Sequence, residues 1–367
     1  MNIVVTGSDG FIGKNLCIFL QEKHHKVLKI NRKTSKNKSI EYLMQADFVF
    51  HLAGINRTLD LSEFNTGNLE FTRFIVDSLI KLDRSTPLVF TSSSQVEANN
   101  DYGESKLAAE KIVQTYSSKT SADIYIYRLK NVFGKWCKPN YNSFVATFCY
   151  NILNNIDISI NNPKTPISLL YIDDVCKAFI GLLEEKKKPG FQEIPLEFNT
   201  TVGDVADIIY SFKSNRNNLI IERVGANLIR ALYSCYLSYT TPSSFNYSIP
   251  RYEDERGVFC EMLKTKDSGQ FSFFTAHPGI TRGGHYHHSK SEKFLVIKGH
   301  ANFKFENINT GERHELKVDG SKSEVVETIP GWTHDITNCG NEELIVMLWA
   351  NEIFDREQPD TFPRELF

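Results

Sequence analysis

The glycine-rich segment TGSDGFIG constrains the fold of this chain more than any other part of its sequence. Gly7, Gly10 and Gly13 lie between the apolar run NIVVTG and a segment with helical periodicity, in which Ile12 and Leu16 share one face. Glycines at this spacing let the backbone approach a pyrophosphate at the start of a helix, where amide N–H groups and the helix dipole favour negative charge. The pattern therefore predicts a strand, a tight turn and a helix that bind a dinucleotide.

Short apolar runs alternate with helical periodicity over the first 240 residues. HKVLKIN, DFVFHLAG, PLVFTSS and DIYIYRL are typical of buried strands, and NLEFTRFIVDSLIKL is typical of a helix. This alternation predicts an α/β fold with a doubly wound parallel sheet. The segment TTPSSFNYSIP is typical of a linker, and beyond it apolar runs recur at hairpin intervals, which predicts an all-β barrel or sandwich. For a chain of 367 residues we expect two domains, at 1–243 and 244–367.

The composition excludes several classes of function. With a formal net charge of -2, the chain has no electrostatic attraction to nucleic acid or to anionic membranes. The sequence begins with a strand pattern rather than a basic and apolar leader, and no apolar run approaches the roughly 18 residues of a membrane span. Its 7 cysteines are scattered and lack CxxC spacing, which favours reduced thiols. We therefore expect a cytoplasmic protein without membrane insertion or a nucleic-acid partner.

The end of the second predicted strand, KINRK, bears on the choice of cofactor. A fold that prefers NAD carries an acidic residue here, which binds the ribose hydroxyl, whereas this chain has Asn31 and Arg32. An arginine at this position suits a 2′-phosphate, and the expected cofactor is therefore NADPH. A solvated basic turn is the alternative interpretation of the same residues.

Tyr102 and Lys106 in YGESK are four residues apart at the start of a predicted helix, so their side chains share one face. This spacing is not diagnostic, because Tyr286 and Lys290 form a second such pair. Position distinguishes the first pair, which follows the strand LVFTSSSQ and precedes IYRLKNVFG. The order of TGxxGxxG, HLAG, SSS, YxxxK, RLxNVFG and YIDDV resembles the extended short-chain dehydrogenase/reductases, which have a Rossmann fold, over residues 1–240.

That resemblance implies roles for individual residues. Tyr102 would donate a proton to the substrate, and Lys106 would lower the pKa of the phenol and hold the nicotinamide ribose. Ser93 would hydrogen-bond the substrate carbonyl, with Ser92 or Ser94 in its place if the register differs by one residue. The resemblance also implies a cofactor site formed by Gly7, Gly10, Phe11, Ile12, Gly13, Asn31, Arg32, Leu52, Ala53, Gly54, Tyr102 and Lys106.

The residues after the candidate serine narrow the type of reaction. Relatives that eliminate water from nucleotide sugars carry an acid pair there, because elimination needs a carboxylic acid and a carboxylate. In SSSQVEA this chain has Ser94 and Gln95 at those positions. The resemblance therefore favours a reductase or an epimerase over a dehydratase.

A histidine-rich segment, GITRGGHYHHSKSEKFLVIKG, gives the second half of the chain its own chemistry. Alternation along a strand places His285 and His287 on one face, and Tyr286 and His288 on the other. Three neutral imidazoles and one carboxylate suit Zn, Mn, Fe or Ni, and ligand type alone does not choose among them. Zinc is the ion we expect. The spacing of this segment and of PGWTHDITN matches both cupin motifs, and it predicts a cage of His285, His287, Glu292 and His334.

A second resemblance assigns His285 differently. YEDERGVFCEML and TRGGHYH are similar to segments of the deoxysugar 3,5-epimerases, cupins in which the histidine of RGxHY removes a proton beside a ketone. By that similarity His285 would be the general base, whereas the metal motif makes it a ligand. The complete ligand set favours the ligand role and leaves His288, Tyr286 or a group elsewhere as the candidate base. Arg256 would bind a phosphate or a sugar hydroxyl.

The whole arrangement, including FGKWCKPNYNS and NEIFDREQPDTF, resembles the bifunctional capsular-polysaccharide enzymes of the CapF type. The resemblance implies a UDP-4-keto-6-deoxy-HexNAc substrate. The cupin would epimerise its C3, and the reductase would use NADPH to form UDP-2-acetamido-2,6-dideoxy-L-talose, on the route to N-acetyl-L-fucosamine. The family also implies a homodimer formed through the cupin domain. The alternative is an NADPH-dependent 4-keto-sugar reductase whose cupin serves only in dimerisation.

Overall fold

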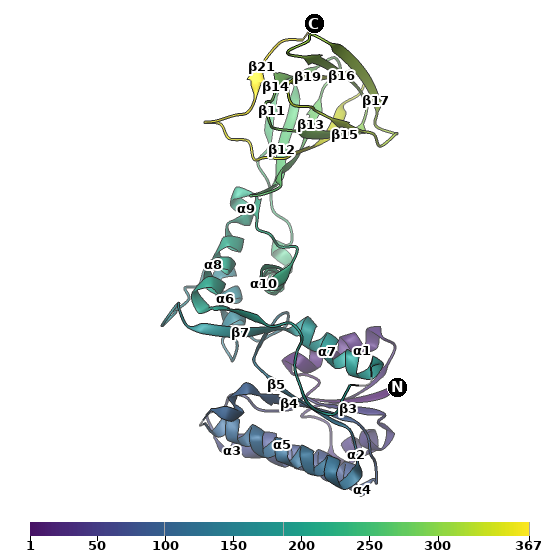
Figure 1. Cartoon of the computed structure of the whole chain (residues 1–367), viewed down its shortest axis with the longest axis vertical. Coiled ribbons are helices and arrows are strands. Elements are labelled where there is room, and N and C mark those ends of the chain that lie inside the picture. The colour runs from purple at the N-terminus through teal and green to yellow at the C-terminus, as the bar shows by residue number, and fades with distance from the viewer. Residues whose placement is uncertain (99, 186, 367) are drawn as a thin grey trace. The chain divides into compact units, whose positions relative to one another are not determined.

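The computed structural model of the protein describes residues 1–98, 100–185 and 187–366 (Figure 1). Its contacts divide the chain into two compact units. The first comprises Met1–Ile209 and Arg230–Thr240, and the second comprises Tyr210–Ile229 and Thr241–Phe367. The chain therefore passes between the units more than once. The domain boundary expected at residue 243 concerns which parts of the chain fold independently, and it stays a prediction.

A parallel sheet with helices on both faces forms the centre of the first unit, as Figure 1 shows. Its inner strands are rich in valine, isoleucine and phenylalanine and are buried on both faces, as is typical of parallel sheets. The strands are β1 (Asn2–Thr6), β2 (Lys26–Ile30), β3 (Phe48–His51), β4 (Leu88–Ser93), β5 (Ile124–Leu129) and β8 (Gly190–Gln192). Their spatial order is β2-β1-β3-β4-β5-β8.

Two apolar clusters hold helices against opposite faces of this sheet. One cluster joins α1 (Phe11–Glu22) and α7 (Ile172–Glu184) to the sheet through residues such as Leu16 and Phe179. The other contains Leu43, Leu79 and Val113, which belong to α2 (Lys36–Gln45), α4 (Phe71–Lys81) and α5 (Asp101–Thr120). This arrangement confirms the predicted doubly wound α/β fold. Because the strands are parallel, their carboxyl ends meet at one edge, where ligands bind in such folds.

Smaller elements extend the first unit beyond its main sheet. A second sheet has the order β6-β7-β9, in which β6 and β7 are parallel and β9 is antiparallel to β7. The elements are α3 (Ser62–Phe64), the π-helix η1 (Asn65–Glu70), the 3-10 helix η2 (Ser94–Glu97), β6 (Asn131–Phe133), α6 (Phe144–Leu153), β7 (Pro166–Tyr171) and β9 (Phe198–Thr201). Two further helices, α8 (Val202–Lys213) and α10 (Asn227–Leu237), cross the division between the units.

Antiparallel strands dominate the second unit and confirm its predicted all-β fold. Their inner faces share an apolar cluster that includes Phe294, Phe303 and Val346. The elements are α9 (Asn215–Asn218), β10 (Ile220–Ile221), the 3-10 helix η3 (Pro242–Ser244), β11 (Tyr252–Asp254), β12 (Gly257–Thr265), β13 (Gly269–Ala276), β14 (Thr281–Tyr286), β15 (Glu292–Lys298), β16 (His300–Asn307), β17 (Arg313–Asp319), β18 (Val325–Glu327), β19 (Trp332–Asn338), β20 (Leu344–Ala350) and β21 (Phe362–Pro363). The sheet orders are β10-β12-β13-β20-β15-β18, with β11 beside β12, and β17-β16-β19-β14-β21.

An extra residue interrupts the pairing of β14 with β19. Gly283 lies opposite Asp335 and His285 lies opposite His334, so Gly284 has no counterpart in β19. Gly283 and Gly284 have φ angles of 99° and 73°, which residues with a Cβ rarely adopt. Just after this bulge His285 lies opposite His334, with 4.7 Å between their ring centres.

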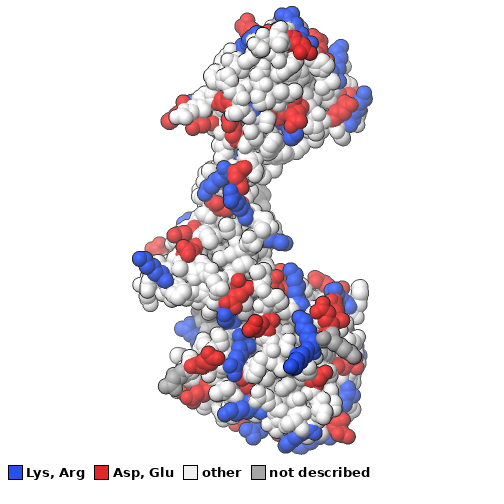
Figure 2. Space-filling model, in the orientation of Figure 1, with Lys and Arg blue, Asp and Glu red and all other residues white. Residues whose placement is uncertain are grey.

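The helices and the surface charge agree with the composition. None of the described helices is long and apolar enough to cross a membrane. Figure 2 shows that, on the face drawn, basic and acidic side chains are interspersed over both units. The mixture agrees with the near balance of 42 basic and 44 acidic residues in the sequence.

Candidate active site and metal centre

The glycine turn between β1 and α1 permits close approach of the backbone. The Gly10 N–H donates to the Gly7 carbonyl at 2.9 Å, and Gly7 has a φ angle of 66°. A Cβ at Gly13 would lie 2.1 Å from the same carbonyl oxygen, so a glycine is needed where α1 begins this close to the turn. The N-terminus of α1 therefore stands at the turn, where it favours a phosphate group.

A cavity of about 570 Å³ opens at this turn, within the first unit. Of the predicted cofactor residues, Asn31 and Ala53 lie outside its lining. The Asn31 side chain accepts the Lys33 N–H at 2.9 Å, and the Ala53 N–H donates to Thr6 Oγ1 at 3.1 Å. These contacts instead fix the backbone of two loops beside the cavity. The predicted residues that line it are Gly7, Gly10, Phe11, Ile12, Gly13, Arg32, Leu52, Gly54, Ser93, Tyr102 and Lys106.

The predicted proton donor lies in the first turn of α5. Asn100 caps this helix by accepting the Gly103 N–H at 2.8 Å, which fixes the orientation of the turn. Burial raises the pKa of the Tyr102 phenol above its ordinary value, and hydrogen bonding with Ser93 opposes this rise. The two hydroxyl groups therefore lie together at the cavity, where a substrate carbonyl would need them.

Lys106 is buried one turn farther along α5. Its Nζ donates to the Thr91 carbonyl at 2.9 Å. Burial lowers the pKa of Lys106 to about 8, and the Glu110 carboxylate opposes this shift. A Cβ at Gly54 would lie 2.9 Å from Nζ, so the glycine leaves room for the ammonium group. An ammonium here stabilises a phenolate, which helps Tyr102 to donate its proton.

A buried ion pair stands behind the serines at the end of β4. Glu110 is 2% exposed, and Arg128 donates to its two carboxylate oxygens at 3.1 and 2.9 Å. The Ser92 hydroxyl also donates to Glu110, whereas Ser94 is exposed. Among the three candidate serines, Ser93 is therefore the one placed to hydrogen-bond the tyrosine.

Removing the Glu110 carboxylate should strongly destabilise the first domain. In Glu110→Ala the Arg128 guanidinium and the Ser92 hydroxyl lose their buried acceptor, and we expect the free energy of unfolding to fall by about 3 kcal/mol. Glu97→Ala is the matched control, because Glu97 pairs with the same arginine but is 82% exposed. Its loss should cost less than about 1 kcal/mol. Calorimetric unfolding of both variants provides the comparison, and equal losses would contradict the expectation.

One part of the cavity wall escapes prediction from the sequence. The segment after β6 contributes Trp136, Lys138 and Tyr141 to the lining. Lys138 Nζ lies 5.4 Å from the centre of the Tyr141 ring, and the Tyr141 hydroxyl donates to the Arg57 carbonyl at 3.2 Å. Aromatic faces and a cation suit a nucleobase and a phosphate. The aromatic and basic residues of FGKWCKPNYNS are a signal, but the fold is needed to place them here.

Histidines from β14, the following loop and β19 meet a carboxylate at the start of β15. One ligand atom from each of the four lies within 4.8 Å of the others. The Glu292 Oε2 atom is 3.3 Å from Nε2 of both His287 and His334. The ring centres of His285 and His287 are 4.9 Å apart. The structure thus brings together the four residues that the cupin motifs predict.

This donor set suits a divalent cation. Among the described residues, neither ring nitrogen of His334 makes a well-aligned hydrogen bond, although the residue is only 3% exposed and its Nε2 lies 3.3 Å from Glu292 Oε2. Burial, together with the His334 ring, lowers the pKa of His285 to about 4, so its imidazole is neutral at pH 7. Burial alone would raise the pKa of Glu292, but two imidazoles and Lys290 lower it well below its ordinary value. Neutral imidazoles and an ionised carboxylate are the forms that bind such a cation.

The other candidate side chains of the second unit lie outside this group of ligand atoms. The rings of Tyr286 and His288 pack at 5.5 Å, and both contact Phe362. Arg256 is exposed and pairs with Asp254 at 2.6 Å. A catalytic role for Tyr286 or His288, and a ligand-binding role for Arg256, stay predictions.

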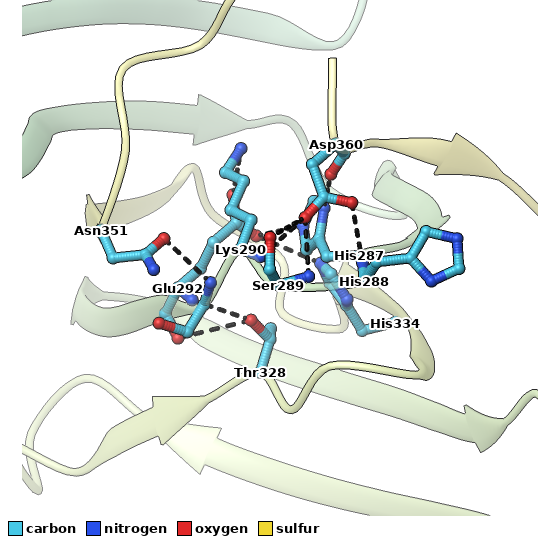
Figure 3. Close-up of polar contacts among 10 residues, drawn as sticks. His287, His288, Ser289, Lys290, Glu292, Thr328, His334, Asn351 and Asp360 are labelled. Atoms are coloured by element: carbon cyan, nitrogen blue, oxygen red, sulfur yellow. Dashed lines mark hydrogen bonds and ion pairs between the residues drawn. The ribbon is translucent and has the colours of Figure 1, made fainter. Parts of the chain in front are cut away.

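Two residues beside the cage, Asp360 and Lys290, are not predicted as part of it. Figure 3 shows the Asp360 carboxylate bonded to the loop that contains His288 and Ser289. The Lys290 ammonium lies 3.1 Å from Oε1 of Glu292. Lys290 belongs to the second tyrosine–lysine pair in the sequence, but no motif marks Asp360, which is 70 residues from the loop it contacts.

Comparisons with known proteins agree with this division into a nucleotide cavity and a cage. Residues 3–194 match the model of the NAD dependent epimerase/dehydratase family. Residues 252–362 match the model of the polysaccharide biosynthesis C-terminal domain. The first match contains the cavity serine, tyrosine and lysine, and the second contains the histidines and the glutamate of the cage.

Individual relatives extend the similarity over the whole chain. UDP-2-acetamido-2,6-beta-L-arabino-hexul-4-ose reductase of Pseudomonas aeruginosa is 51% identical over 364 residues, which cover 99% of this chain and 98% of the relative. The crystal structure of capsular polysaccharide assembling protein CapF from Staphylococcus aureus matches with a TM-score of 0.93 and 39% identity, covering 100% of both chains. The structure of UDP-glucuronic acid 4-epimerase from Bacillus cereus is 21% identical, with a TM-score of 0.52. The match covers 58% of this chain and 84% of the epimerase chain, and it bears on the fold alone.

Proposed function

This chain belongs to the NAD dependent epimerase/dehydratase family and, over its whole length, to the family of CapF, and from this membership we propose a two-step reaction. Family membership makes it a UDP-sugar reductase of capsular polysaccharide biosynthesis with a nicotinamide cofactor. We propose that its second domain epimerises C3 of a UDP-4-keto-6-deoxy-HexNAc. The first domain then reduces the 4-ketone with NADPH to UDP-2-acetamido-2,6-dideoxy-L-talose, in the cytoplasm. The observation that carries the proposal is a serine–tyrosine–lysine cavity and a four-ligand cage in one chain.

In the reductase domain three side chains would act on the ketone. NADPH, when bound, supplies the hydride that reduces the carbonyl carbon. The Ser93 hydroxyl hydrogen-bonds the carbonyl oxygen and orients it toward the tyrosine. Tyr102 donates its phenolic proton to that oxygen as negative charge develops there, and Lys106 stabilises the phenolate that remains. Lys106 is buried and Tyr102 is partly buried, which limits how far water weakens this charge interaction.

Arg32 should determine the preference for NADPH over NADH. It lines the cavity just after β2, where the 2′-phosphate of the adenosine would lie. Arg32→Ala should raise the KM for NADPH about tenfold to a hundredfold, since it removes one charged partner, and should leave the KM for NADH within about twofold. The neighbouring exposed Lys33 supplies the control variant Lys33→Ala. Equal effects on the two cofactors would contradict the assignment.

In the cupin domain the cage would serve proton removal beside the ketone. The three histidines and the glutamate would hold a divalent cation, with zinc as the expected ion, which would supply stabilisation of negative charge on a nearby oxygen. A proton on the carbon next to a carbonyl is removable because the enolate spreads its charge onto oxygen. His288 or Tyr286 would remove that proton if His285 serves as a ligand. Reduction of the ketone closes this route, so epimerisation must come first. A homodimer formed through this domain is part of the same proposal.

The direct test is NADPH oxidation with UDP-4-keto-6-deoxy-HexNAc candidates, followed by NMR of the product. We expect NADPH consumption and a product with the talo configuration, inverted at C3. NADPH consumption with retention at C3 would support the alternative, a reductase whose cupin serves only in dimerisation. If none of the UDP-4-keto sugars is reduced, the proposed function is wrong.

A further inference from the structure

Residues 351–364 run along the loop that carries His287, and we call this segment the C-terminal strap. Asn351 Oδ1 accepts the Ser291 N–H at 3.1 Å at one end of that loop. At the other end, the Arg364 N–H donates to the Gly284 carbonyl at 2.9 Å. The strap is therefore bonded to both ends of the segment that supplies two of the four cage residues.

Asp360 makes the densest set of contacts between the strap and the loop, as Figure 3 shows. Its Oδ1 accepts the His288 N–H at 2.8 Å. Its Oδ2 accepts the N–H groups of Ser289 and Lys290 at 2.7 and 2.8 Å, and the Ser289 hydroxyl at 2.9 Å. Hydrogen bonds to a charged acceptor are roughly twice as strong as neutral ones. One carboxylate thus holds three consecutive backbone N–H groups.

The backbone of Asp360 acts on a cage residue directly. Its carbonyl oxygen contacts Nδ1 of His287. Because a carbonyl can only accept, Nδ1 must carry a proton, and in the neutral ring the lone pair is then on Nε2. That Nε2 faces the cage, 3.3 Å from Oε2 of Glu292. The contact selects the tautomer and the ring orientation that a metal ligand requires.

The strap also affects the orientation of Glu292 through Lys290. With its N–H held by Asp360, Lys290 turns its side chain inward, where it is 6% exposed and lies 3.1 Å from Oε1 of Glu292. Its Nζ lies 5.7 Å from the centre of the Phe354 ring, which also belongs to the strap. Oε1 of the glutamate is thus engaged by the lysine, and Oε2 faces the imidazoles.

From these contacts we infer that Asp360 is a positioning residue, which holds the loop so that His287 and Glu292 are arranged for a divalent cation. The inference rests on the proposed metal centre. It predicts that the loop is ordered by the strap and that the affinity for the cation depends on a residue that does not touch it. Groups that orient metal ligands in this way typically change metal affinity by about 10-fold to 100-fold when they are removed.

The test measures zinc binding by the full-length chain, in competition with a fluorescent chelator. Asp360→Ala should weaken zinc binding about 10-fold to 100-fold, and Asp360→Asn, which keeps one acceptor oxygen, should lie between it and the wild type. Glu357→Ala, at an exposed acidic residue of the same strap, is the matched control and should bind zinc as the wild type does. The absorption spectrum of the cobalt-loaded chain should shift in both Asp360 variants, because it reports ligand geometry.

The outcomes separate this inference from the proposed function. Wild-type zinc affinity and an unchanged cobalt spectrum in both Asp360 variants would overturn the inference and leave the metal centre in place. A wild-type chain that binds no zinc would instead contradict the metal centre itself. If Asp360→Ala lowers the melting temperature of the metal-free chain, its weaker zinc binding no longer separates positioning from folding. Asp360→Asn, if it melts at the wild-type temperature, then decides whether the inference holds.

Discussion

Tyr102→Phe should abolish reduction of the keto sugar and leave its epimerisation intact. The change removes the proton donor but keeps the ring, which packs 5.8 Å from the Phe64 ring. Loss of a positioned general acid typically lowers the rate by 10²- to 10⁴-fold, and we expect a decrease of about a thousandfold in kcat with little change in KM. The proposed epimerisation site lies in the other domain and would not use this group.

Both activities can be read in one experiment. The variant is incubated with the UDP-4-keto sugar and NADPH in deuterated water, and the sugar is examined by NMR. We expect deuterium at C3 and no reduced product. Tyr42→Phe, at a half-buried tyrosine of α2, is the control and should reduce the sugar normally. Absence of deuterium uptake in both proteins would contradict the proposed division of labour.

His334→Ala should have the opposite effect, with loss of epimerisation and retention of reductase chemistry. Structural zinc sites in small peptides contribute about 10–16 kcal/mol, so one ligand in four of a zinc site would account for roughly 3 kcal/mol, or more than a hundredfold in Kd. Elemental analysis should therefore find little bound metal after dialysis. Deuterium uptake at C3 should fall in parallel, because the remaining residues no longer stabilise the enolate oxygen.

The control for this variant is His314→Ala. His314 lies on β17, is exposed and has no part in the cage. Metal content and deuterium uptake should match the wild type. If His334→Ala keeps its metal, His334 is not a ligand. If it loses the metal but still exchanges deuterium, the cation is structural rather than catalytic.

Local patterns explain why much of this protein could be predicted from its sequence. The glycine turn and the start of α5 depend on residues a few positions apart, and helix and strand geometry then determines which side chains share a face. The same reasoning placed His285, His287 and Glu292 near one another, because strand alternation and one short loop separate them. Predicting His334 as a ligand required the cupin motif, since no local rule connects β14 with β19.

The parts of the fold and of the site that could not be predicted depend on contacts between segments far apart in the sequence. Asp360 has no periodicity or spacing that relates it to a loop 70 residues earlier. Trp136 and Tyr141 reach the cavity wall only because the chain after β6 returns toward the glycine turn. The segment Tyr210–Ile229 belongs to the second unit partly through β10, whose two residues pair in parallel with β12 and are too few to give a strand signal.

The extra glycine in β14 has a consequence for how related genes are compared. Loss of the single codon for Gly284 would leave every cage residue in the translated sequence, in the same order. It would also remove the bulge and restore regular alternation to the strand, with His285 still opposite His334 but on a backbone without the extra residue and its positive φ angle. An in-frame deletion of three nucleotides would thus yield a gene that still encodes all four ligands and a protein whose strand backbone beside the cage has changed, so a comparison of the cage residues alone would not detect it.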